Sequence, residues 1–338
     1  MDVLDNVTIS FFSGIILMAI LHGLLLASIF LFHNRLNTKS NKFLALSIIV
    51  ICVILTYELS YWLDLDEKIL TWIDYIPIYI RTAIPVGIFY FVIFLINPKH
   101  QLTRFEKLGF VVMAIEIALH FISIFTSFFI KNAKTSETVE DFFTMTLWSF
   151  SIICCLIFIP LALQKVNRYQ TYLYNNYSTT NRKNLKWLKV FLILYLIIIC
   201  PIIISLFQYL FGHNDAGDFT FGIVTICFVI LLFWISYFLI IHYSWFEIVS
   251  VKNENSEKQV IQNKLSSNTV NYYNQLLKLM SEEKMYEDIN VTLDRLSEKL
   301  QISSGYLSQI IKENEQKNFF EFINFYRIEA VKKKLLNE

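Results

Sequence analysis

The chain has 338 residues, of which 55% are hydrophobic and only 17% are charged, and its mean hydropathy is +0.50. This composition excludes an ordinary soluble domain, in which charged residues are more frequent. The net charge of +1 says little about partners, because it averages two regions of different character. Most of the chain is therefore expected to lie in a membrane.

Seven apolar stretches of about 20 residues follow one another over residues 1–245. An α-helix of that length crosses a hydrocarbon core of roughly 30 Å. The stretches run from Ile9 to Phe32, Phe43 to Leu63, Ile73 to Ile96, Leu108 to Ile130, Phe142 to Leu163, Lys189 to Leu210 and Thr220 to Ile241. The first lacks a basic leader and a small-residue cleavage site, so we interpret it as a retained span.

The short loops between these stretches differ in charge. Every second loop is basic, and the residues concerned are Arg35, Lys39, Lys42, Lys99, Arg104, Lys107, Lys165, Arg168, Arg182, Lys183 and Lys186. The alternate loops are acidic or nearly neutral. Because loops rich in lysine and arginine stay in the cytoplasm, the N-terminus is expected outside and everything after His242 inside.

A few ionisable residues fall within the apolar stretches, where they are costly and therefore candidates for a functional site. Glu58 and Arg81 are predicted to reach similar depths and to pair. Glu116 and His120 share one helix face at a spacing of four residues. Two interpretations stay open: a ligand cavity or protonation switch, and hydrogen bonds or ion pairs that hold the bundle together. Kinks are predicted at three prolines, Pro77, Pro85 and Pro201.

The sequence shows no catalytic signature. All five cysteines lie in apolar stretches without a CxxC pair or a histidine cluster, so we predict no metal site and no disulfide. There is no glycine-rich phosphate loop, GxSxG or HExxH pattern. The protein is therefore not expected to be an enzyme or to need a cofactor.

The C-terminal part has a different character. A polar linker is expected over residues 246–269, followed by a helix from Val270 to Lys284. Thr292 and Ser303 are suitable N-caps for helices running from Leu293 to Leu300 and from Ser304 to about Lys312. Interlocking apolar residues join the two helices: Leu296, Leu300, Ile302, Leu307, Ile310 and Ile311. This pattern predicts a helix-turn-helix within a domain at residues 270–338.

A helix-turn-helix places its second helix in the major groove of DNA. The residues predicted to contact DNA are Ser304, Gly305, Tyr306, Gln309, Lys312 and Arg327. From Tyr243 onward, however, 13 lysines and arginines stand against 14 aspartates and glutamates, so attraction to phosphates would be weak. A small helical domain for protein contacts is the alternative interpretation.

The tail resembles the AraC/XylS family of bacterial transcription regulators. The family has a helix-turn-helix pattern, LxxLAxxLxxSxxYLSxxFK, followed by a linker helix with the pattern N-F-x-x-[YF]-I-N-x-x-R-I-x-x-A. The residues that match the first pattern are Leu293, Leu296, Leu300, Ser303, Tyr306, Leu307 and Ser308. The residues that match the second are Asn318, Phe319, Phe322, Ile323, Asn324, Arg327, Ile328 and Ala330, so the two patterns together cover about 45 residues. The apolar region is similar in plan to the membrane sensor part of such proteins from Bacteroidetes. The resemblance implies a second helix-turn-helix after the linker helix, and the chain ends at Glu338 before one, so we interpret the domain as truncated.

Together these features predict an all-α protein: a seven-helix transmembrane sensor bundle with a cytoplasmic helix-turn-helix tail, in a bacterial inner membrane. The expected partners are DNA, membrane lipid, a second copy in a homodimer, and an unknown small-molecule or protein signal. A signal would shift the bundle between two arrangements, and the last span would pass the shift through the linker. The alternatives are a transporter or membrane-embedded enzyme with a vestigial tail, and a receptor whose tail binds a protein.

Overall fold

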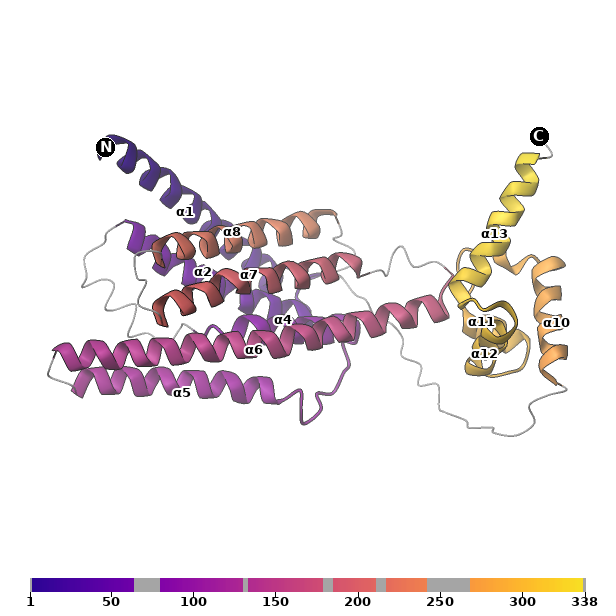
Figure 1. The fold of residues 1–338 in the computed structure, drawn as a ribbon. Helices are drawn as coiled ribbons and strands as arrows, with labels where there is room; N and C mark the ends of the chain where they lie inside the picture. The colour runs from indigo at the N-terminus through magenta and orange to yellow at the C-terminus, as the bar shows by residue number, and fades with distance from the viewer. Residues whose placement is uncertain are drawn as a thin grey trace. The chain divides into compact units, whose positions relative to one another are not determined.

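The computed structural model describes residues 2–63, 80–129, 133–178, 185–210, 217–241 and 268–336 (Figure 1). Over these residues all named elements are helices. The chain divides into two compact units, one holding Met1–Lys165 with Trp187–Val251 and the other Val166–Lys186 with Lys252–Glu338. The second unit thus combines the tail with a segment that the sequence assigned to the membrane region.

The helices of the apolar region are α1 (Asp2–Phe32), α2 (Lys39–Trp62), α4 (Ala83–Ile96), α5 (Leu108–Phe129), α6 (Ala133–Asn176), α7 (Lys186–Leu210) and α8 (Gly217–Ile241). Among the described residues, five segments are long and apolar enough to cross a bilayer: Phe11–Phe32, Lys39–Ser60, Leu108–Thr126, Phe142–Asn176 and Lys186–Ile204. Two apolar segments, Ala83–Ile96 and Gly222–Phe238, are shorter. For the described residues, the prediction of an all-helical fold with several helices of spanning length is confirmed.

Helix α4 is the most deeply buried element of the first unit. Nearly every one of its residues is buried, as expected for a helix that is apolar all round. It packs against α2 at Gly87, where a Cβ atom would lie only 2.2 Å from the Ser47 hydroxyl. The hydroxyl of Ser47 also reaches the carbonyl of Ile84 at 3.3 Å. A small residue and a hydroxyl therefore let these two backbones approach closely.

The sequence predicted a span from Ile73 to Ile96, and the structure corrects where its helix begins. Residues 64–79, which include Pro77, lie outside the described part of the chain. Arg81 and Thr82 form a turn, and α4 starts only at Ala83. Pro85 falls in the first turn of α4, where its missing N–H breaks no internal hydrogen bond, whereas Pro201 lies inside α7.

A second correction concerns α6, which has 44 residues and continues well past Leu163, where the predicted span ends. Lys165 and Arg168 therefore lie on this helix and not in a loop. The extension has no glycine or proline, and Val166, Tyr169 and Leu173 are buried at spacings of three and four residues. Helical continuation with one apolar face follows from that pattern.

The tail forms its own small core. Its elements are α10 (Asn268–Ser281), the short 3₁₀ helix η2 (Met285–Glu287), α11 (Leu293–Lys299), α12 (Ser304–Glu315) and α13 (Phe319–Leu336). The buried cluster is Leu276, Met280, Met285, Val291, Leu293, Leu296, Leu300, Leu307, Ile311, Phe319, Phe322 and Ile323. This core draws on every helix of the tail, so the packing of each depends on the others.

Local chemistry sets the ends of the tail helices. Both predicted N-caps are present: the Thr292 hydroxyl accepts from the Arg295 N–H, and the Ser303 hydroxyl accepts from the Tyr306 N–H. Asn318 and Glu321 exchange side-chain and backbone hydrogen bonds of 2.9 Å at the start of α13, which is a capping box. The turn between α11 and α12 contains Gln301 at φ 56°. A left-handed residue ends one helix and allows the next to start after two residues.

Candidate functional site

Glu116 lies at the centre of a buried polar cluster in the first unit. Its carboxylate accepts hydrogen bonds from the N–H of Arg81 at 3.0 Å and from the N–H of Thr82 at 2.9 Å. The Thr82 hydroxyl donates to the same carboxylate. These N–H groups precede the first turn of α4, where a helix has no internal acceptors. The Glu116 side chain, from α5, therefore caps the N-terminus of α4 inside the bundle.

The same cluster includes the two residues predicted to pair. Arg81 interacts electrostatically with both Glu58 of α2 and Glu116 of α5. One cation therefore lies near two carboxylates from different helices. The guanidinium carbon of Arg81 also lies 4.6 Å from the ring centroid of Trp148 on α6. Helices α2, α5 and α6 thus all meet the turn that begins α4.

Two histidines lie on helices of the apolar region, His120 on α5 and His22 on α1. His120 lies one turn beyond Glu116 on α5 and is half-buried. His22 on α1 forms a 2.6 Å hydrogen bond with the Ser236 hydroxyl of α8 and stacks on Phe233 at 4.8 Å. Such contacts match the alternative in which polar residues join helices.

A second charged group was not anticipated from the sequence. Glu106, which precedes α5, is buried and accepts hydrogen bonds from Lys165 of α6 at 2.7 Å and from the Thr103 N–H at 2.9 Å. The carboxylate oxygen that accepts from Thr103 also lies 2.8 Å from Nε2 of His100. Burial alone would raise the pKa of Glu106, but the hydrogen bonds from Lys165, His100 and Thr103 hold it at about 2. Glu106 thus ties the segment between α4 and α5 to α6.

We expect replacement of Glu106 by glutamine to destabilise the protein by on the order of 2–3 kcal/mol at neutral pH. A carboxyl whose pKa is lowered on folding adds stability above its unfolded value of 4.5, and that stability is lost as pH falls toward 2. The difference between wild type and Glu106→Gln should therefore shrink below about pH 4.5. Thermal unfolding of the full chain in detergent between pH 7 and pH 3 measures this. A difference that does not change with pH would contradict it.

The predicted DNA-contacting residues of α12 lie mostly on its exposed side. Gly305, Gln309 and Lys312 are exposed, whereas Ser304 and Tyr306 are half-buried. A Cβ atom at Gly305 would meet nothing within 4 Å. The Tyr306 ring meets Tyr272 of α10 edge-on at 6.0 Å. The Gln309 amide donates to Glu313 at 2.7 Å, which places a carboxylate on the same side of the helix.

Arg327 has a different environment from the other predicted DNA contacts. Its guanidinium donates to the backbone carbonyls of Tyr286 at 2.7 Å and Asp288 at 2.9 Å, and at 3.2 Å to both the carbonyl and the hydroxyl of Ser178. Burial lowers the pKa of Arg327, and Asp288 opposes that shift. With its donors engaged by the protein, Arg327 organises the tail, and a direct DNA contact would require it to release these partners.

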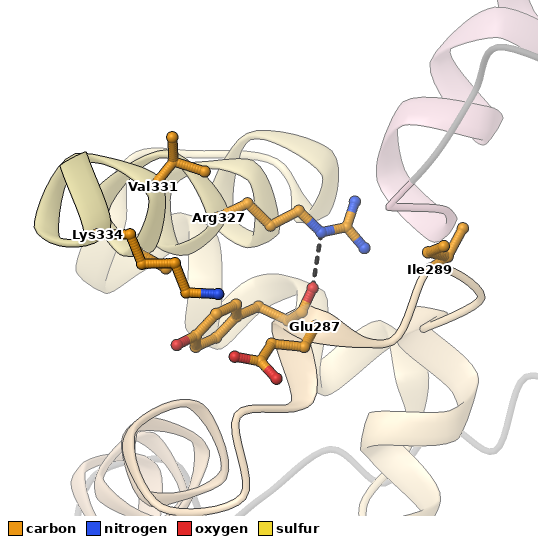
Figure 2. Close-up of a pocket in the computed structure, with 7 residues that line it drawn as sticks. Glu287, Ile289, Arg327, Val331 and Lys334 are labelled. Carbon is orange, nitrogen blue, oxygen red and sulfur yellow. Dashed lines mark hydrogen bonds between the residues drawn. The ribbon is translucent and has the colours of Figure 1, made fainter. Parts of the chain in front are cut away.

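Figure 2 shows Arg327 reaching from α13 toward the segment that carries Glu287 and Ile289. A pocket of about 460 Å³ lies here, lined by Tyr286, Glu287, Ile289, Arg327, Ala330, Val331 and Lys334. Further along α13 an apolar stripe is exposed, formed by Ile328, Val331 and Leu335. The sequence pattern for DNA contacts did not indicate either feature.

No protein-family model, curated protein or solved structure matches this chain. Within the described ranges, no group of three or more histidine, cysteine, aspartate or glutamate residues is placed to hold a metal ion. The contacts described above give two candidate sites, which are the polar cluster around Glu116 and the exposed side of α12.

Proposed function

We propose that this protein is a membrane-anchored transcription regulator that binds DNA through α12 and responds to a signal through its transmembrane bundle. The observation that carries the proposal is the pair α11 and α12, two short capped helices joined by a tight turn over a shared apolar core. In a helix-turn-helix, the second helix contacts the edges of DNA bases with exposed polar residues near its N-terminus.

The AraC/XylS resemblance supports this proposal residue by residue. In that pattern Asn318 and Phe319 start the linker helix, and here Asn318 forms the capping box while Phe319 is buried. Phe322 and Ile323 are likewise in the core, and Arg327 holds the turn before α11. Most of the matching residues therefore have packing or hydrogen-bonding roles in this tail.

For the membrane region we propose seven spans with the N-terminus outside and the tail in the cytoplasm of a bacterium. Five helices already have spanning length, and α4 and α8 supply the shorter apolar segments. The basic loops support this orientation. In this arrangement Glu106, His100 and Lys165 lie at the cytoplasmic end of the bundle.

Binding of the full chain in lipid nanodiscs to DNA at increasing salt tests the proposed function. We expect Tyr306→Ala with Gln309→Ala to weaken binding by about tenfold or more, because base contacts are worth roughly 1–3 kcal/mol each. The matched control is Asn274→Ala with Gln275→Ala on α10, where both side chains are exposed. Equal affinity in the two double variants would contradict DNA reading by α12, as would an extracytoplasmic location for a reporter fused after Lys252.

A variant at Gly305 allows the effect of α12 on DNA affinity to be distinguished from its effect on the stability of the tail. A methyl group there meets no neighbour, and alanine is a better helix former by about 0.5–1 kcal/mol. Gly305→Ala should therefore leave the tail as stable as wild type or more so. If the start of α12 approaches DNA closely, the same variant should bind DNA more weakly.

A tail that binds a protein partner is the second candidate function. It is favoured by the exposed apolar stripe of Ile328, Val331 and Leu335 on α13 and by the nearly neutral charge of the tail. Salt dependence distinguishes the two functions, since DNA binding releases counterions and weakens steeply with salt.

A further inference from the structure

The end of α6 belongs to the same compact unit as the tail, and it brings Ser178 into contact with Val291, 113 positions further along the sequence. Tyr177 forms an isolated antiparallel bridge with Thr292. The Ser178 hydroxyl donates to the carbonyl of Val291 at 2.8 Å. The Tyr174 ring meets Phe320 of α13 edge-on at 5.5 Å. We name residues 174–178 the α6 clasp.

The clasp contacts the residues that set the start of α11. Thr292 is the N-cap of that helix, and Val291 next to it is buried in the tail core. Arg327 joins the two parts, because it donates to Ser178 and to the carbonyl of Asp288 in the preceding turn. Ser178 is itself buried. Displacement of Ser178 would leave buried donors and acceptors unpaired, so the contact has a preferred arrangement.

Helix α6 also carries Trp148, which lies against Arg81 of the buried polar cluster. The α6 helix is continuous from Ala133 to Asn176, with Pro160 between Trp148 and the clasp, so a single helix runs from the neighbourhood of the cluster to the clasp. A small shift or rotation of a packed helix is a common way to carry a change between distant sites.

We propose that α6, through its clasp, is the element by which the transmembrane bundle controls the DNA-binding tail, an inference that rests on the proposed function. This differs from the path expected from the sequence, in which the last span acts through the linker. In the clasp mechanism, movement of α6 displaces Ser178 from Arg327 and Val291. The turn at residues 286–292 then loosens, and with it the position of α11 and α12.

Disulfide trapping in the full chain tests the geometry of the clasp. Paired residues of an antiparallel bridge have Cα atoms about 4.5–5.5 Å apart, within the range a disulfide accepts. The test pair is Tyr177→Cys with Thr292→Cys, and the control pair is Tyr177→Cys with Glu298→Cys. In the control pair the second cysteine lies about 9 Å further along α11. Under mild oxidation the test pair should therefore cross-link at least about tenfold more than the control pair. Each single variant serves as a background control. Equal cross-linking of the two pairs would overturn the clasp.

Hydrogen exchange in nanodiscs tests the coupling without any DNA. We expect Ser178→Ala to speed exchange over residues 286–292 about fivefold, since it removes hydrogen bonds to Val291 and Arg327. The matched control is Thr171→Ala, because the Thr171 hydroxyl donates to the carbonyl of Asn167 in its own helix. Trp148→Ala should also change exchange over 286–292, and this effect should disappear when combined with Ser178→Ala.

The outcomes separate the two proposals. Independent effects of Trp148→Ala and Ser178→Ala, or no effect of Ser178→Ala beyond that of Thr171→Ala, would overturn coupling through α6 whatever the tail binds. If the cross-link and exchange results are as expected while no variant binds DNA, the clasp stands and the DNA-binding function falls. If DNA is bound, its affinity should change with Ser178→Ala and not with Thr171→Ala.

Discussion

Replacing Glu116 by leucine should remove most of the folded protein from the membrane. Its carboxylate accepts from two backbone N–H groups and one hydroxyl at the start of α4, and buried donors left without partners cost about 1–3 kcal/mol each. The sum approaches the roughly 5–15 kcal/mol that keeps a protein folded.

The measurement is the yield of monodisperse full-length protein after detergent extraction. Thr126→Leu on the same helix is the matched control, because its hydroxyl bonds the carbonyls of Ile122 and Ser123 in its own helix. That variant should extract like wild type. If Glu116→Leu does so too, the polar cluster does not hold the bundle together.

Variants of Glu58 and Arg81 test the same polar cluster with the same measurement, the yield of extracted protein. Losing either Glu58 or Arg81 alone leaves a charge in a poor solvent and should lower the yield. Exchanging them, with Glu58→Arg and Arg81→Glu, should recover only part of the loss, because the Arg81 position also faces Glu116. Full recovery would show that Glu58 alone balances this cation.

The sequence predicted the features that depend on local chemistry. Thr292 and Ser303 were recognised as caps because their side chains act within three residues of their own position. A similar depth for Glu58 and Arg81 stays a prediction, because it was counted along a span from Ile73 and α4 begins only at Ala83. The role of Glu116 could not be predicted in this way, since it depends on how α5 packs beside the start of α4.

The α6 clasp was missed for a related reason. A hydropathy pattern marks the apolar part of a helix, and it ended the predicted span at Leu163 because polar residues follow. Burial of Val166, Tyr169 and Leu173 shows that a helix with one apolar face continues there. The amphipathic spacing was visible in the sequence, but the contact of Ser178 with Val291 joins positions that are 113 residues apart, and no local pattern marks it.

Two copies of the chain in one membrane should bind DNA far more tightly than one copy. The described tail contains one α11–α12 pair, and specific recognition usually combines two such elements about 34 Å apart along the duplex. The exposed face of α12 also carries Glu313 beside Gln309, and the tail has no basic excess to add nonspecific affinity. A single copy is therefore expected to bind weakly, with little sequence preference.

Nanodiscs that hold either one or two copies of the full chain allow the comparison on DNA selected from a random pool. When the first tail is bound, the second binds at a high effective concentration, so we expect two-copy discs to bind about 10²-fold more tightly or better. The selected DNA should contain two half-sites one helical turn apart. Tyr306→Ala with Gln309→Ala in both copies should abolish the gain. Tight, sequence-specific binding by one-copy discs at physiological salt would show instead that one α12 is sufficient.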